Sequence, residues 1–283
     1  MRLTTSRSRS LAGILAATVA ALVLAGCGSG SAPADNPYGL IEAGVLNAVT
    51  DTSQPPFASA AADGKPQGFI IDLADEIGKR LGLRVTYKSS SVSSALAGLT
   101  SGQYDLAASG LGVTAERQKS VVFTKPLFWS TTAVLTTTAS NAKTAGEFAG
   151  KKVGVVTGAV QETFIKTKMP GAIATKFQSS STGITQLLNG NIDAFVLGGP
   201  DAQEYLKQYA KLRVAFAAPV DHPTAMALPK KDTALQAAMD QQISAMVQDG
   251  TFATIYKKYF VTAPAPELID SWPALKTQFP AAG

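Results

Sequence analysis

The sequence predicts an α/β fold in two lobes, and three observations support this prediction. Strand-like and helix-like patterns alternate from residue 45 to residue 259, which favours parallel strands joined by crossover helices. The alternation starts again near residue 153, so two βα blocks of roughly 100 residues each follow one another. At 283 residues, the chain is long enough to bury two separate cores.

The first block begins with a strand over residues 45–50. A helix over 72–81 follows, because Leu73, Ile77 and Leu81 recur at the spacing of one helical face and Gly82 suits its C-terminal end. Strands over 84–87 and 105–109 enclose a short helix over 93–101. Thr114 is then expected to cap another helix through its side-chain oxygen.

The second block repeats the pattern up to residue 259. We predict strands over 153–156, 193–197, 213–216 and 224–228, and helices over 159–168, 182–188, 200–209, 232–249 and 251–259. Residues 129–132 and 218–224 are the segments most able to join the lobes. A double crossing of this kind permits hinge closure, because a few residues absorb the backbone change.

The N-terminus has the pattern of a secretory signal. A basic leader precedes an apolar run over residues 11–26, and Leu-Ala-Gly-Cys ends that run at Cys27. The cysteine makes the segment resemble a bacterial lipoprotein signal, in which the thiol is acylated. A transmembrane helix is the alternative, but 16 residues are short for one; a buried structural cysteine is the other. We expect a signal peptide at 1–26 and lipidated Cys27 with a flexible tether at 27–37, so that a lipid holds the protein outside the cytoplasm on the cell membrane.

Composition excludes several classes of function. Of the 25 basic residues, three lie in the predicted signal, so the mature formal charge is 22 − 20 = +2. No cluster of lysine and arginine is interleaved with aromatic residues, so we expect no nucleic-acid partner. The chain has one histidine, His222, and one cysteine. We therefore expect no internal disulfide, no metal site, no cofactor and no Ser-His-Asp triad.

Several short motifs, in order along the chain, resemble the bacterial family 3 extracellular solute-binding proteins. They are Gly-Phe-Ile-Ile-Asp-Leu at 68–73, Leu-Thr-Ser-Gly-Gln-Tyr-Asp at 99–105, Thr-Ala-Glu-Arg at 114–117, Phe-Thr-Lys-Pro at 123–126, and Asp-Gly-Thr at 249–251 with Lys-Tyr-Phe at 258–260. The resemblance covers about residues 40–260 and implies a type II periplasmic-binding-protein-like clamp. Each lobe would be a mixed, mostly parallel sheet flanked by helices, with two hinge crossings between the lobes.

The resemblance also implies a function and domain limits. Such a clamp captures a small carboxylate solute, an amino acid or a derivative, and delivers it to an ABC permease in the membrane. We expect a monomer without enzymatic activity. Lobe 1 would comprise 38–130 plus 223–262, lobe 2 would comprise 131–222, and residues 263–283 would form a C-terminal tail along the surface.

By this resemblance, Arg117 grips the carboxylate of the ligand. A guanidinium offers two parallel donors to a carboxylate and keeps its charge. The alternative is a solvated helical arginine paired with Glu116. Ser109, Gly110 and Gly112 match family positions where serine hydroxyls are frequent. The two glycines then offer backbone contacts to a ligand, or only permit a turn.

The resemblance implies further ligand contacts, and at some of these positions the sequence departs from the family pattern. Asp51 is either a ligand contact or a loop cap, and Gln54 and Val92 stand where the family commonly has aromatic residues. On the second lobe, Thr157, Val160 and Gln161 match the second ligand-facing loop, and Val160 replaces a common threonine. Each polar residue there either binds the ligand or caps the following helix.

Gly198 is the largest departure. The amino-acid receptors of the family usually have an aspartate at this position, which pairs with the ammonium of the ligand. Asp201 is a possible substitute, although an acid at the start of a helix is the simpler interpretation. The carboxylate grip is thus present, and the ammonium grip is absent or rebuilt.

Two alternatives remain for the function. One is a periplasmic dehydratase-like enzyme on the same scaffold, for which Asp51, Glu162 or Asp201 would supply the acid or base. The other is a tethered sensory receptor. Fold resemblance alone does not separate them from a transport receptor.

Overall fold

Two five-stranded sheets form the framework of the protein in the computed structural model, which describes residues 36–220 and 222–280. The first sheet has the strand order β5-β1-β6-β13-β7, and the second has the order β10-β9-β11-β8-β12. We call each sheet with its covering helices a lobe. The predicted signal peptide, Cys27 and most of the predicted tether lie outside the described residues.

The first sheet is mixed but mostly parallel. Its strands are β1 (Val45–Thr50), β5 (Arg84–Ser89), β6 (Leu106–Gly112), β7 (Val121–Phe123) and β13 (Thr224–Pro229). Strand β1 pairs in parallel with β5 and β6, whereas β13 runs antiparallel to both β6 and β7. The central strands β6 and β13 are buried almost throughout, as expected where helices cover both faces of a sheet.

The second sheet repeats this design with β8 as its antiparallel member. Its strands are β8 (Thr131–Thr137), β9 (Lys152–Val156), β10 (Ile173–Phe177), β11 (Ala194–Gly198) and β12 (Leu212–Pro219). Strand β9 pairs in parallel with β10 and β11, and β8 pairs antiparallel with β11 and β12. A small third sheet joins β2 (Ser53–Gln54), β3 (Ala58–Ala60) and β4 (Pro66–Gln67).

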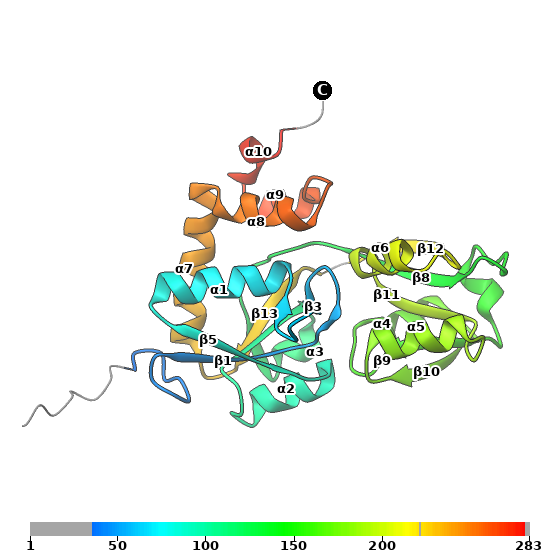
Figure 1. The fold of residues 1–283 in the computed structure, drawn as a ribbon, viewed down its shortest axis with the longest axis horizontal. Helices are drawn as coiled ribbons and strands as arrows, with labels where there is room; N and C mark the ends of the chain where they lie inside the picture. Colours follow the sequence, from blue (N-terminus) through cyan, green and yellow to red (C-terminus); the bar gives the residue numbers. More distant parts are fainter. Residues whose placement is uncertain (1–35, 221, 281–283) are drawn as a thin grey trace, which may run out of the picture. The chain divides into compact units, whose positions relative to one another are not determined.

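The predicted helices lie close to their expected positions, whereas three short helical segments over 145–148, 266–271 and 275–278 were not predicted. Together they are α1 (Phe69–Leu81), α2 (Val92–Thr100), α3 (Ala115–Gln118), η1 (Ala145–Phe148), α4 (Gln161–Lys168), α5 (Ser180–Leu188), α6 (Gly199–Gln208), α7 (Thr233–Asp249), α8 (Thr251–Tyr259), α9 (Pro266–Ser271) and α10 (Leu275–Gln278). Figure 1 shows α4 and α5 beside strands β9, β10 and β11, which they cover. Within the described ranges, none of the helices combines the length and apolarity that a membrane span requires.

Helix α1 shows how the predicted pattern becomes packing. Leu73 and Ile77 are fully buried in the core of the first lobe, and Leu81 packs against the same core. The helix ends at Gly82, whose φ of 70° lies in the left-handed region that favours glycine. The periodicity and the C-terminal glycine therefore predicted this element correctly.

The chain crosses between the lobes twice, and the two crossings lie side by side. It leaves the first sheet after β7 and returns through the segment before β13. The Phe128 and Thr224 backbones exchange hydrogen bonds of 3.3 and 2.8 Å, and Trp129 Nε1 donates to the Val220 carbonyl at 3.3 Å. The predicted architecture of two mixed, mostly parallel sheets with two crossings is confirmed.

The C-terminal segment is more ordered than a tail lying on the surface. Helices α9 and α10 bury Leu268, Trp272 and Leu275 in the core of the first lobe. The Trp272 indole also donates to the Pro126 carbonyl at 2.7 Å. The segment is therefore part of the first lobe's packing up to residue 280, while the predicted residue limits of the lobes stay predictions.

Candidate ligand-binding cleft

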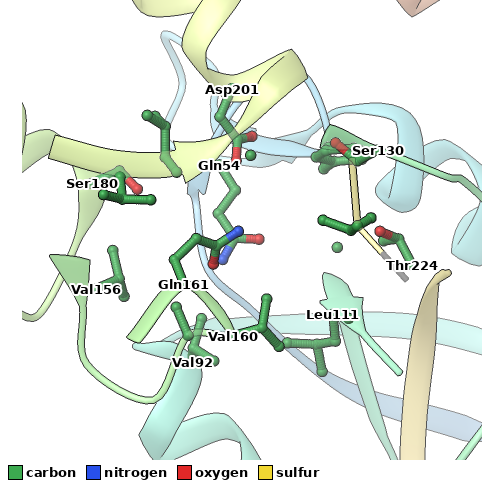
Figure 2. Close-up of a pocket in the computed structure, with 18 of the residues that line it drawn as sticks. Gln54, Val92, Leu111, Ser130, Val156, Val160, Gln161, Ser180, Asp201 and Thr224 are labelled. Carbon is green, nitrogen blue, oxygen red and sulfur yellow. The ribbon is translucent and has the colours of Figure 1, made fainter. Parts of the chain in front are cut away.

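A cavity of about 70 Å³ lies between the two lobes. Its wall combines apolar and polar side chains in about equal measure; the apolar ones are Phe57, Val92, Leu111, Val156, Ala159, Val160, Val196, Leu197 and Val220. A water needs about 10–15 Å³ of such space, so the cavity has room for roughly five to seven waters or a small organic solute. Figure 2 shows Gln54 and Gln161 reaching into the middle of the pocket, with Asp201 on one side and Val92, Val160 and Leu111 on the other.

Arg117 contributes the positive charge of the cleft. It lies on α3, whose N-terminus is capped by the Thr114 side chain as predicted. The guanidinium donates to two backbone carbonyls at 2.8 Å, Gly112 of the first lobe through Nη1 and Gly158 of the second lobe through Nη2. These two bonds hold the side chain across the mouth of the cleft.

The charge of Arg117 has no acidic partner in the described part of the chain; its hydrogen bonds go to carbonyls. Burial lowers the pKa of Arg117 to about 10, so the group stays protonated at neutral pH. A guanidinium has five N–H donors, and the two carbonyls use two of them. The other three donors have no hydrogen-bond partner among the described residues, and a carboxylate has the geometry to accept from such donors.

All eleven predicted ligand contacts lie within the described residues, and eight of them line the cleft. These eight are Gln54, Val92, Gly110, Gly112, Arg117, Val160, Gln161 and Gly198. Ser109, Asp51 and Thr157 lie behind the lining. The Ser109 hydroxyl accepts from the Asp51 N–H at 3.0 Å, and the Thr157 hydroxyl donates to the Phe177 carbonyl at 3.1 Å. Contact between these residues and a ligand stays a prediction.

Asp51 supports the lining from behind. Its carboxylate accepts from the Ser53 N–H at 3.0 Å, the Ser53 hydroxyl at 2.7 Å and the Gln54 amide at 3.3 Å. Burial raises the pKa of Asp51, and these hydrogen bonds partly oppose the rise. Asp51 therefore caps its loop, one of its two predicted roles, and also orients Gln54, which does reach the cleft.

Asp201 is the acidic group among the described residues that line the cleft. It lies in the first turn of α6, is 9% exposed, and its Oδ1 has no hydrogen-bond partner in the described structure. Its other oxygen lies beside Gly198, where a Cβ added to the glycine would be 2.9 Å from Oδ2. Burial raises the pKa of Asp201 well above its ordinary value, and the nearby charge of Asp51 adds to the rise. The simpler interpretation, an acid that only starts a helix, is therefore incomplete.

Sequence reasoning missed several polar lining residues. They are Ser130, Thr131, Ser180, His222 and Thr224. Four of the five lie in or next to the two segments predicted to cross between the lobes. Because crossings in a two-lobed clamp border the cleft, that position was the available signal. The His222 ring lies over Gly112 at the cleft.

Hydrogen bonds join the lobes across the cleft in addition to the Arg117 bridge. The Ser53 carbonyl accepts from the Tyr205 hydroxyl at 3.2 Å, and the Ser53 hydroxyl accepts from the Ser180 N–H at 3.3 Å. The two lobes are therefore in direct contact at Ser53, the residue next to Gln54. This arrangement suits a site that surrounds a small solute.

Comparison with known proteins agrees with the fold and the cleft. Residues 46–262 match the bacterial extracellular solute-binding proteins, family 3, and the chain belongs to this family. A structure of an ancestral arginine-binding protein bound to glutamine superposes with a TM-score of 0.75 at 32% identity, covering 77% of this chain and 99% of that one. The predicted type II, two-lobed architecture is confirmed.

Curated relatives are similar over most of their length. The histidine-binding periplasmic protein of Salmonella typhimurium is 31% identical over 222 residues, which are 75% of this chain and 85% of the relative. The putative ABC transporter arginine-binding protein 2 of Escherichia coli K12 is 28% identical over 216 residues, 75% of this chain and 88% of the relative. The protein is thus an extracytoplasmic solute-binding protein, and the prediction that it is not an enzyme is confirmed by these binding proteins.

Proposed function

We propose that this protein is the receptor of an ABC importer and that it captures an amino acid or amino-acid derivative by its carboxylate. The observation that carries the proposal is the partly buried Arg117 guanidinium, which lines the cleft and has only two backbone carbonyls as partners among the described residues. A buried cation without an acidic partner costs free energy unless a ligand supplies the negative charge. The names of the relatives, which include arginine-binding and histidine-binding proteins, support an amino acid.

Capture of the solute uses groups from both lobes. The Arg117 side chain already contacts Gly112 of one lobe and Gly158 of the other, so a carboxylate bound there touches both. Gln54 and Gln161 offer amide donors and acceptors from opposite sides of the cavity. The ligand-loaded protein then passes its solute to a permease.

The anchor is also part of the proposal. The basic leader, the apolar run and Leu-Ala-Gly-Cys at 24–27 support acylation of Cys27, which would hold the receptor beside its permease. Mass spectrometry of the protein purified from bacterial membranes tests this. We expect a mature chain that starts at a diacylated or triacylated Cys27, and an unmodified cysteine would contradict the anchor.

The carboxylate grip is tested by calorimetry on the soluble domain without Cys27. A panel of amino acids, betaines, sulfonates and keto acids is first screened by thermal shift, after a denature–refold step that removes carried ligand. A ligand at 100 times its Kd adds about 2.7 kcal/mol to the free energy of unfolding. No shift across the panel would contradict a solute receptor.

Arg117→Ala should then weaken binding of the selected carboxylate about 30-fold or more, since a charge-assisted contact of about 2 kcal/mol is lost. Arg117→Lys keeps the charge but loses the planar pair of donors, so its affinity should lie between those of the wild type and Arg117→Ala. Lys119→Ala removes an exposed positive charge nearby, whose partner is Glu116, and serves as the control. Equal affinity of Arg117→Ala and the wild type would reject the assignment.

A further inference from the structure

Asp201 has a carboxylate oxygen that nothing in the described structure explains. The residue is 9% exposed and lines the cleft. A hydrogen bond from the Gly198 backbone reaches one end of the carboxylate, whereas Oδ1 has no partner. An unpaired charged oxygen in an apolar site costs several kcal/mol. A group that serves only to start helix α6 would not need to bear this cost.

The surroundings of Asp201 make the cost larger. Asp51 faces it from the loop of the first lobe, and its negative charge disfavours ionisation of Asp201. The Tyr205 hydroxyl, one turn further along α6, donates to the Ser53 carbonyl and is therefore not available to Oδ1. Arg117 also lines the cleft, but its side-chain hydrogen bonds within the described structure go to two carbonyls. A cation from outside the protein is the missing partner.

We propose that Asp201 binds the α-ammonium of the ligand, and that it does so from a position three residues after Gly198. The inference rests on the proposed function, because Arg117 must hold the carboxylate of the same molecule. A zwitterion then satisfies both charges of the cleft: Arg117 takes the carboxylate, and Asp201 takes the ammonium. Every α-amino acid carries an α-ammonium group, whereas few carry a cationic side chain. We therefore assign the single carboxylate in the described lining, that of Asp201, to the α-ammonium group.

Gly198 and Asp201 share one place in the cleft. A Cβ on Gly198 would lie 2.9 Å from Asp201 Oδ2 and 3.7 Å from its Cγ, and it would meet nothing else within 4 Å. The Gly198 backbone has φ −65° and ψ 146°, which any residue adopts. A side chain at 198 would thus enter the space that the Asp201 carboxylate now fills. The Asp201 carboxylate therefore occupies the part of the cleft that an acidic side chain at position 198 would enter.

The test compares three variants with the wild type and uses two sets of probes. The probes are the common L-amino acids and, for the tightest binder, the same acid without its α-amino group, such as glutaramate for L-glutamine. Asp201→Asn should bind the amino acid about 100-fold more weakly but bind the deamino acid within about threefold of the wild type. The variant with both Asp201→Ala and Gly198→Asp should recover most of the lost affinity for the amino acid. Glu204→Gln removes a charge from the same helix outside the cleft. It should change neither the affinity for the amino acid nor the affinity for the deamino acid.

Two outcomes would overturn the inference and leave the receptor in place. One is an unchanged affinity of Asp201→Asn for an amino acid with an uncharged side chain, including the case in which only arginine or lysine is affected. The other is an equal loss for the amino acid and its deamino form, which would indicate a structural role. If the wild-type protein binds no amino acid at all, the proposed function fails together with the inference.

Discussion

At the scale of single residues, Gly198 and Asp201 show what a local pattern can and cannot predict. The sequence marks Gly198 as a departure from the family pattern, and three residues on it offers an acid. Whether that acid points to solvent or into a cleft depends on the rotation of α6 against its sheet, which no local pattern specifies. Arg117 was predictable because its charge, its cap at Thr114 and its loop form one motif. Asp51, Ser109 and Thr157 are close in sequence to lining residues, but they are not part of the lining themselves.

The unpaired carboxylate predicts a gain in stability when it is removed. Because burial and Asp51 raise the pKa of Asp201 in the folded state, ionisation of Asp201 disfavours folding at neutral pH. Asp201→Asn should therefore raise the Tm of the ligand-free domain at pH 7–8 by about 2 °C or more, or about 1 kcal/mol. The gain in Tm should shrink as the pH falls through the raised pKa of Asp201, because the carboxylate becomes protonated. It should vanish below the ordinary pKa of 3.8.

Thermal unfolding of both proteins from pH 4 to pH 8 measures this difference. The same substitution would then weaken ligand binding and stabilise the empty protein. A wild-type Tm that exceeds the variant's at pH 8 without ligand would show that Oδ1 has a partner in solution.

At the scale of elements, prediction succeeded where burial is one-sided and periodic. The strand over 45–50 and the long helix up to residue 249 were located to within a residue at most boundaries. Strand β10 was missed because it is an edge strand with mostly exposed side chains, so no alternation marks it. Strand β8 was missed for another reason. Its threonine-rich segment had been interpreted as part of a crossing, although β-branched residues favour strands.

The C-terminal helices lie beyond the family match, which ends at residue 262, yet they belong to the core. Trp272 is buried, donates to the Pro126 carbonyl and lies under the Lys125 ammonium, 5.1 Å from its ring centroid. Trp272→Ala should cost about 3–5 kcal/mol of unfolding free energy, the range for large aromatic residues in cores. Chemical denaturation measures the loss, and exposed Lys276→Ala is the control from the same segment. A loss below about 1 kcal/mol would mean that this segment is not packed in solution.

At the scale of the whole molecule, the glycines at the cleft allow the lobes to come together. A Cβ on Gly112 would lie 2.5 Å from His222 Nε2 and 3.1 Å from Val160 Cγ1, which belongs to the other lobe. A Cβ added to Gly158 would lie 3.2 Å from the Cβ of Ser93, which belongs to the first lobe. Side chains there would separate the lobes. The family resemblance predicted the two-lobed fold as a whole, but these contacts depend on how the lobes meet, which sequence does not specify.

Gly112→Ala should therefore weaken ligand binding about tenfold, because overpacking costs about 1–3 kcal/mol and falls on the closed arrangement. Gly146→Ala is a matched control, since nothing lies within 4 Å of its added Cβ. Calorimetry gives the affinities, and small-angle scattering of the ligand-bound proteins gives their dimensions. Equal affinity and equal dimensions for Gly112→Ala and the control would show that the lobes tolerate the methyl group.

The place of β13 has a consequence for biogenesis. This strand lies between β6 and β7 in the first sheet, although the entire second sheet separates it from them in sequence. When the chain emerges from its N-terminus, residues 131–219 already contain every strand of the second sheet. The first sheet must wait for residues 224–229 with the edges of β6 and β7 unpaired. A chain truncated within that interval would leave the β13-facing edges of β6 and β7 unpaired, so the first sheet is completed only after the second lobe has been made.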